Sequence, residues 1–422
     1  MALQIAMRST DLRQPCGLYV HIPFCLARCR YCAFVSSDYE LGAAERYLEA
    51  LARESETAVE GGRWTVEEGG RPPAHSCPPP STFHPPPGRF TTLYLGGGTP
   101  SVLPVELLER VAAMPPVAAA LAGAAERTVE ANPGTVDAAK LSALRRLGFD
   151  RISLGAQSFD DAELKLLGRI HRAGDVAEAV AAARRAGFAN LGLDLIFGLP
   201  GQRPEGFFAS LDAALALEPE HVSLYGLTYE PGTPLAEAIK GTVPLTPEGT
   251  VPLPLPCDEE AERDMYLGAV ERLLAAGYVH YEIANFALPG RESRHNLNYW
   301  TGGEYLGLGA GAASYLAGER RVNAGDVAAY SALLAAGRSP VESSERLDPE
   351  KRAREALMLG LRMTAGVDLA AFQARTGFDA RGLFGPTLDG HVRAGRVECS
   401  ADRLRLTLEG LLLANSVMSD FI

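Results

Sequence analysis

The regular alternation of short β-type segments with helical patterns constrains the fold more than any other feature of the sequence. The expected strands are LYVHI (18–22), TTLYL (91–95), RTVEA (127–131), RISLG (151–155), LGLDLIFG (191–198) and HVSLYGL (221–227). Apolar residues at helical spacing predict helices at 43–57, 136–147, 160–168, 174–187 and 204–217. This order is typical of βα units and a parallel sheet. Six units predict an α/β fold with a partial (β/α)6 barrel of the TIM type, with functional side chains at the carboxyl ends of the strands.

The remaining sequence divides the chain into further regions. Residues 61–90 and 241–257 are rich in Gly and Pro, which is typical of surface insertions. From about residue 350, shorter helical patterns precede a hairpin signal around 400–403, as in a small α+β, winged-helix-like domain. We therefore expect a barrel core at 1–240 with its insertion at 61–90, a region completing the barrel at 241–345, and a C-terminal domain at 346–422.

Charge and hydropathy narrow the class of ligand and the compartment. The formal charge of −12 argues against a protein that mainly binds nucleic acid through its phosphates, so small ligands are expected. No apolar run approaches the roughly 20 residues that span a bilayer, and the N-terminus is too weakly apolar for a secretory signal. These features predict a cytoplasmic protein; peripheral membrane contact through a local basic patch remains open.

Three of the seven cysteines lie close together in YVHIPFCLARCRYCAF (19–34), at Cys25, Cys29 and Cys32. Structural zinc normally takes four protein ligands in paired sets, and no second pair follows at zinc-finger distance. Three thiolates better suit a [4Fe-4S] cluster with one iron left open to a substrate or cofactor. On spacing alone, zinc and chance remain the alternatives.

A glycine-rich segment, LGGGTPS (95–101), follows the second expected strand. Glycines let the backbone approach a ligand closely, and Thr99 adds a hydroxyl. A tight turn explains the segment equally well. It is not the dinucleotide fingerprint, because no third glycine takes the required place before a helix.

The cysteine motif, the glycine-rich segment, TVEANPGT (128–135), RISLGAQSFDDAELKLLGRIH (151–171) and LDLIFGLPGQ (193–202) occur in an order that resembles the radical SAM superfamily. Within it, the sequence is similar to the oxygen-independent coproporphyrinogen III oxidases and their HemW-type heme-chaperone relatives. The resemblance implies a cluster on Cys25, Cys29 and Cys32, S-adenosyl-L-methionine (SAM) at its open iron, and an electron donor for the cluster. It implies SAM contacts by Tyr19, Gly97, Gly98, Thr99, Glu130, Gln157, Arg169 and Asp194. Any one of these, taken singly, is more often a strand-end polar residue or a helix cap, but eight of them in the family's order make that interpretation untenable.

Two features resemble the chaperone branch more than the oxidase branch. HNLNYW (295–300), followed by GLGAGA, is typical of the chaperones and makes His295 a candidate heme contact; a polar loop anchored by Tyr299 and Trp300 is the structural alternative. The oxidase motif continues with a fourth cysteine, where this chain has Phe34, a side chain that does not replace a thiol.

The resemblance therefore implies a protein that binds heme and transfers it to heme-accepting respiratory proteins. Whether the chain is also an enzyme stays open at this point. The alternatives are a coproporphyrinogen III oxidase, which decarboxylates coproporphyrinogen III to protoporphyrinogen IX, and a radical SAM enzyme with another substrate.

Overall fold

The computed structural model describes residues 16–60, 90–241 and 255–422. All but the last residue of the predicted insertion at 61–90, and most of the segment at 241–257, lie outside the described residues.

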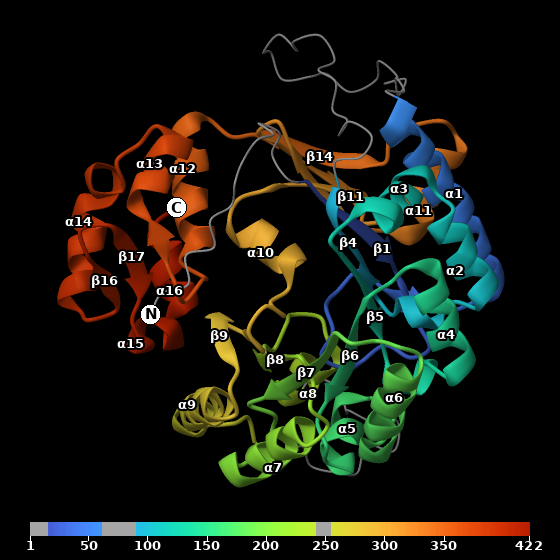
Figure 1. Cartoon of the computed structure of the whole chain (residues 1–422), viewed down its shortest axis with the longest axis horizontal. Coiled ribbons are helices and arrows are strands. Elements are labelled where there is room, and N and C mark those ends of the chain that lie inside the picture. The colour runs from blue at the N-terminus through green and yellow to red at the C-terminus, as the bar shows by residue number, and fades with distance from the viewer. Residues whose placement is uncertain (1–15, 61–89, 242–254) are drawn as a thin grey trace.

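The six expected strands are confirmed, and they form the parallel centre of one large sheet (Figure 1). Each pairs in parallel with the next in chain order, so that the carboxyl ends meet at one edge. Their bounds are β1 (Cys16–Ile22), β4 (Phe90–Gly97), β5 (Glu126–Ala131), β6 (Arg151–Gln157), β7 (Leu191–Phe197) and β8 (His221–Gly226).

The sheet extends beyond the predicted barrel strands at both edges. β11 (Glu304–Leu308) pairs in parallel with the outer side of β1, and β12 (Ala313–Leu316), β13 (Glu319–Asn323) and β14 (Val341–Arg346) continue it antiparallel. At the other edge, β10 (Asn285–Ala287) and β9 (Val279–Glu282) follow β8. In the described chain this gives a twelve-stranded sheet with β14 and β9 at its ends, so the barrel stays partial. A separate parallel pair joins β2 (Phe24–Cys25) to β3 (Ser37–Asp38).

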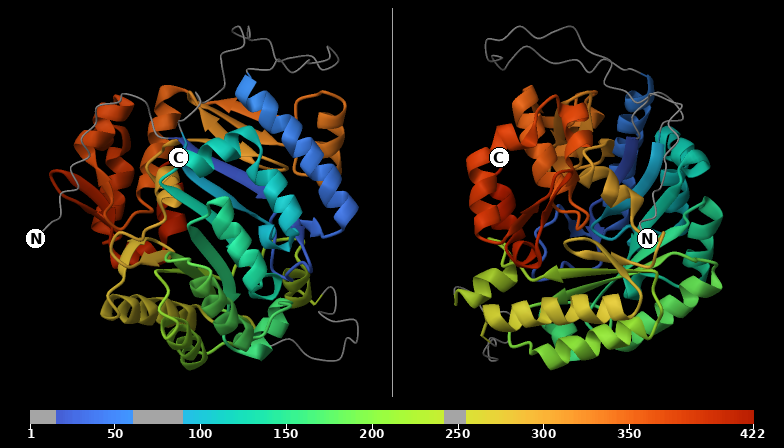
Figure 2. Two further views of the ribbon diagram at one scale, coloured as in Figure 1. Left: turned by 45° about the vertical axis from the view of Figure 1, so that its right-hand side comes forward. Right: turned by 60° about the vertical axis from the view of Figure 1, so that its left-hand side comes forward.

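Helices lie outside the parallel strands, as Figure 2 shows for the blue-to-green part of the chain. Aspartates at helix starts accept backbone N–H groups, as Asp160 does from Ala162 and Glu163, and left-handed glycines such as Gly168 end the helices. The helices that precede the C-terminal region are α1 (Leu41–Glu60), α2 (Val105–Ala112), α3 (Pro115–Gly123), α4 (Ala138–Leu147), α5 (Asp161–Leu167), α6 (Ala173–Arg185), α7 (Pro204–Leu215), α8 (Pro234–Ile239), α9 (Glu259–Ala275), α10 (Arg294–Trp300) and α11 (Val327–Ala335), with 3-10 turns at Pro100–Val102 and Pro133–Thr135.

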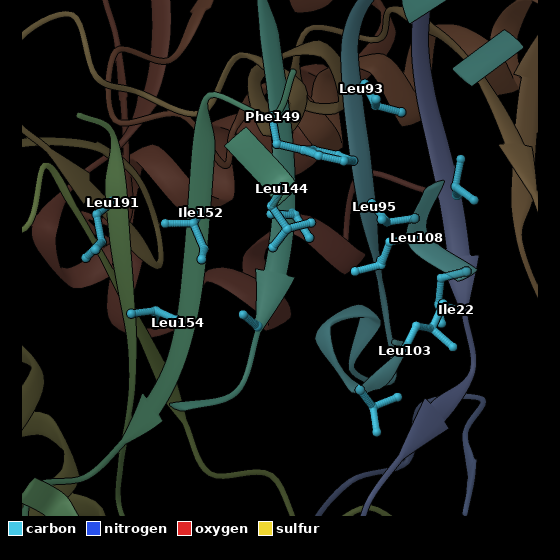
Figure 3. Packing of buried hydrophobic residues seen from close by; sticks show 14 of the residues in the cluster. Ile22, Leu93, Leu95, Leu103, Leu108, Leu144, Phe149, Ile152, Leu154 and Leu191 are labelled. Atoms are coloured by element: carbon cyan, nitrogen blue, oxygen red, sulfur yellow. The ribbon is translucent and has the colours of Figure 1, made fainter. Parts of the chain in front are cut away.

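The main core lies between these helices and the strands (Figure 3). Leu95 and Ile152 point from their strands toward Leu108 and Leu144 of the covering helices, and all four are at most 1% exposed. Parallel strands that helices cover in this way have nearly continuous apolar sequences, and for this reason the six strands could be predicted from the sequence.

A buried carboxylate ties α1 to the antiparallel extension. Glu54 accepts hydrogen bonds from Gly309 N at 2.8 Å, Asn323 Nδ2 at 2.6 Å and Tyr330 Oη at 2.6 Å. Burial raises the pKa of Glu54 to about 7, because the loss of hydration outweighs these three donors. The folded protein therefore keeps a proton on Glu54 at pH values where the unfolded chain has lost it.

We expect Glu54 to make the free energy of unfolding fall as pH rises. Since its pKa is about 7 when folded and 4.5 in the unfolded chain, the loss occurs between these values and amounts to at most about 3 kcal/mol. Urea unfolding at about pH 5 and about pH 8 should show the wild type losing more stability than Glu54→Gln, which does not titrate. Equal losses in both proteins would contradict the assignment.

The C-terminal region has its own core and a three-stranded sheet of order β15-β17-β16. Short helices followed by the β16–β17 hairpin were predicted here, and this α+β arrangement is confirmed. The division of the chain into three regions stays a prediction. The elements are α12 (Pro349–Gly360), β15 (Val367–Asp368), α13 (Leu369–Thr376), α14 (Ala380–Arg393), β16 (Val397–Cys399), β17 (Arg403–Leu406), α15 (Leu408–Leu412) and α16 (Ala414–Ser419).

One arginine joins this region to the large sheet. The Arg362 guanidinium is 3.1 Å from the buried Glu282 carboxylate, and it lies 4.3 Å from the Trp300 ring centroid. The backbone carbonyl of Arg362 accepts the N–H of Ile283 at 3.1 Å.

None of the helices in the described part of the chain is long and apolar enough to cross a bilayer.

Candidate active site

The three predicted thiols lie on one loop, residues 25–36, which we call the thiol loop. Cys25 ends β2, and the loop returns to β3, which pairs with β2. Arg30 holds the middle of the loop: its N–H donates to Leu167 O at 2.9 Å, and its carbonyl accepts from Leu235 N at 2.8 Å. The loop is therefore fixed against the ends of α5 and α8, while the thiols remain half-buried.

Polar groups from two other predicted segments contact the thiols. Arg169 Nη1 donates to Cys29 Sγ at 3.2 Å and Nη2 donates to Gly155 O at 2.7 Å. Its Nε is buried without a partner in the described part of the chain, so one donor is left for a ligand. Cys25 Sγ lies 3.5 Å from Thr99 Oγ1. Burial raises the pKa of both Cys25 and Cys32.

The arrangement of the thiols differs from that of a single-ion site. Within the described residues, no three His, Cys, Asp or Glu side chains gather closely enough to hold one metal ion. A cubane binds each thiolate at a separate iron, so its ligands need not converge on one point. The chemistry of the donors, three thiols with a neighbouring guanidinium, fits an anionic iron–sulfur cluster.

The glycine-rich segment packs directly on the thiol loop. Gly98 N donates to Ile22 O, and Thr99 N donates to Phe24 O, each at 2.8 Å. A Cβ on Gly98 would lie 2.8 Å from Phe24 O, a backbone atom. Gly97 has a φ of +117°, a conformation that favours glycine. The positive φ of Gly97 and the close contact of Gly98 with the backbone of Phe24 give both positions a structural reason to be glycine.

A half-buried carboxylate stands next to the glycine-rich segment. Glu130, at the end of β5, accepts from Tyr94 Oη at 2.6 Å and from Gly97 N at 3.0 Å. Burial raises the pKa of Glu130 to about 7, with the nearby charge of Asp194 as a smaller cause. Near neutral pH this carboxyl is close to its midpoint, so a cation beside it would favour the ionised form.

Glu130 lines a cavity of about 380 Å³ at this end of the sheet. Tyr19 and Gly97, also predicted from the sequence, line the same cavity, and Phe34 stands in its wall. Tyr19 Oη is 2.9 Å from His21 Nδ1, and the two side chains share one face of β1. The structure thus brings three of the eight predicted SAM contacts into one cavity.

The other predicted contacts lie near this cavity but do not line it. Gln157 has a φ of +67° at the end of β6, and its amide lies over Gly155, as the Arg169 guanidinium does. Asp194 lies on β7, where Ser153 Oγ donates to its carboxylate at 3.2 Å. Burial raises the pKa of Asp194.

His295 is placed as a structural anchor. Its Nδ1 is 2.8 Å from Thr92 Oγ1, its Nε2 is 2.9 Å from Tyr299 Oη, and its ring is stacked on Tyr94. The residue is 1% exposed, and burial lowers its pKa to about 3. With both nitrogens engaged and no solvent access, the geometry argues against His295 as a ligand of heme iron. The structural alternative holds as far as the aromatic anchoring goes, but the segment is the helix α10 and not a loop.

Sequence reasoning missed the aromatic wall of the cavity. Tyr299 of α10 and Tyr305 of β11 line it. Tyr94 donates a hydrogen bond to the Glu130 carboxylate. Tyr94 precedes the glycines on an expected strand, so its position was a readable signal. Tyr305 gave no such signal, because β11 was not predicted.

Two family models match the chain: the radical SAM superfamily at residues 83–214 and the HemN C-terminal domain at 347–413. Curated relatives match nearly the whole chain. The heme chaperone HemW of Bacillus subtilis is 36% identical over 96% of this chain and 98% of its own length, and the heme chaperone HemW of Escherichia coli is 33% identical over 97% and 98%.

Among solved structures, the coproporphyrinogen III oxidase HemN from Escherichia coli has the same fold. Its TM-score is 0.76 at 22% identity, covering 97% of this chain and 90% of that one.

Proposed function

Because this chain belongs to the HemW family of heme chaperones within the radical SAM superfamily, we propose that it binds heme and delivers it to acceptor proteins. The observation that carries the proposal is identity of 36% to a heme chaperone over nearly the full length of both chains. A local feature supports it: the position of the oxidase's fourth cysteine is taken by Phe34, which is 72% exposed. The acceptors we propose are respiratory heme proteins.

We propose that Cys25, Cys29 and Cys32 hold a [4Fe-4S] cluster and that the eight predicted residues bind SAM. When bound and reduced, such a cluster supplies an electron to the sulfonium of SAM, so a separate electron donor belongs to the proposal. The contacts that support it are those of Arg169, which offsets negative charge at Cys29, and of Glu130, whose carboxylate suits an ammonium group.

The test of the proposed function is anaerobic. The cluster is reconstituted, hemin is titrated, and transfer of heme to an apo-globin is followed by absorbance. A parallel reaction with SAM, dithionite and coproporphyrinogen III is analysed by chromatography. We expect saturable heme binding, transfer, and no decarboxylated product. Product that increases with time would overturn the chaperone proposal in favour of an oxidase.

We expect Glu130 to make SAM binding depend on pH. Its carboxyl is mostly neutral below its pKa of about 7 and mostly ionised above it, and only the ionised form attracts the ammonium of SAM. Calorimetry at about pH 6 and about pH 7.5 should therefore show the affinity advantage of wild type over Glu130→Gln growing several-fold.

Glu106→Gln is the matched control, because this glutamate is exposed on α2 and lies outside the cavity. A pH-independent ratio between wild type and Glu130→Gln would contradict the assigned contact.

A further inference from the structure

A second cavity, of about 340 Å³, lies between the edge of the large sheet and the C-terminal region. Its lining comes from the loop after α10, from β11, β12 and the start of β13, and from α12 and α13. Figure 1 shows α10 facing α12 and α13 across this part of the molecule. Neither the thiols nor the predicted SAM contacts line it.

Positive charge exceeds negative charge on the walls of this cavity. Arg320, Arg352 and Arg375 line it, against Glu304 and Glu355. Arg320 forms an ion pair with Glu355, and Glu304 accepts the N–H of Ala317 at 2.8 Å.

The other two arginines form no ion pair with any carboxylate in the described part of the chain. Among the described residues, neither Arg352 nor Arg375 lies within ion-pair distance of a carboxylate; Arg375 donates only to the carbonyl of Thr301. Both side chains are exposed, so an anion reaches them without rearrangement of the core. They come from α12 and α13, and Arg375 lies against Gly302 of the loop after α10. Two unpaired guanidinium groups on one cavity suit a ligand with two carboxylates.

Two aromatic side chains are shared by the walls of this cavity and of the cavity that Glu130 lines. Tyr299 and Tyr305 line both cavities, and their rings meet edge-to-face with centroids 4.7 Å apart. Tyr315 continues the row at 6.2 Å from Tyr305. Flat apolar ligands pack well against such rings. The cavity between the large sheet and the C-terminal region therefore offers aromatic contacts for a planar body beside cations for acidic substituents.

We propose that Arg352 and Arg375 bind the two propionate groups of heme, with the macrocycle lying against Tyr299 and Tyr305. This inference rests on the proposed function and adds the place and polarity of the ligand. The C-terminal region is then part of the heme site, and heme bridges it to the large sheet.

The experiment compares hemin with hemin dimethyl ester, in which the propionates are uncharged. Both are titrated into the full-length wild type and into Arg352→Gln/Arg375→Gln, followed by Soret absorbance. The control is Arg393→Gln, since Arg393 is exposed on α14 and lies outside the cavity. Charged hydrogen bonds of this kind predict at least about tenfold weaker hemin binding by the double variant. Wild type should bind the ester more weakly than hemin by a similar factor. The double variant should bind hemin and the ester with equal affinity.

Each result decides the matter. Saturable hemin binding by wild type that is unchanged in the folded double variant, or that the ester matches in affinity, would overturn this inference and leave the proposed function standing. If wild type binds neither compound saturably, the proposed function falls and this inference with it. The ester titration of wild type tests the inference even where the double variant fails to fold.

Discussion

Cys29→Ser is expected to abolish stable iron binding, lowering the content from about four irons per chain to below about one after desalting. Serine is a poor ligand for iron–sulfur clusters, and Cys29 is the thiol to which Arg169 donates a hydrogen bond. The thiol loop is held by backbone contacts of Arg30, so the substitution should leave the fold intact. Iron and sulfide analysis, with the visible absorbance of the reconstituted protein, measures the effect.

The matched control is Cys399→Ser. Cys399 is also half-buried, but it lies on β16 in the C-terminal region, remote in the fold from the thiol loop. It should retain the full iron content. A Cys29→Ser protein that keeps wild-type iron and absorbance would show that the thiol loop does not hold the cluster.

Gly98→Ala is expected to destabilise the protein by about 1–3 kcal/mol and to impair cluster retention. The new Cβ would lie 2.8 Å from Phe24 O, 2.9 Å from Phe24 N and 3.0 Å from Pro23 C. All three are backbone atoms, so no side chain can turn aside, and the segment leading to Cys25 must move instead. Urea unfolding of the apoprotein and iron content after reconstitution measure the two effects separately.

Gly123→Ala provides the contrast, because nothing lies within 4 Å of its Cβ position at the end of α3. Here the same chemical change should be neutral or stabilise the protein by up to about 1 kcal/mol. If both substitutions have the same effect, the close packing of the glycine-rich segment on the thiol loop is not what requires Gly98.

The parallel centre of the fold was predictable because buried strands leave continuous apolar runs between helical patterns. The antiparallel extension was not, for a physical reason. β14, VESSER, has a single apolar residue followed by serines and charged residues, and most of it is exposed, so it lacks the apolar run that reveals a strand. β11 is short and contains a glycine, and it becomes a strand through its pairing with β1.

The candidate site was predictable where residues follow a strand directly. Tyr19, Gly97 and Glu130 end up in one cavity because three neighbouring parallel strands deliver them to the same edge. The place of His295 could not be read in this way. Its two hydrogen-bond partners, Thr92 and Tyr299, lie on different elements, and only the packed structure shows that both ring nitrogens are engaged.

The pairing of β1 with β11 has a consequence for synthesis on the ribosome. β1 lies between β4 and β11, so one of its edges stays unpaired until residues 304–308 have emerged. Through most of translation the nascent chain therefore carries an open strand edge of almost wholly buried residues, a template for wrong pairing. Folding of the barrel in vivo should accordingly depend on chaperones that shield this edge, and ribosomes stalled before residue 304 should display a chain that is sensitive to proteolysis near β1.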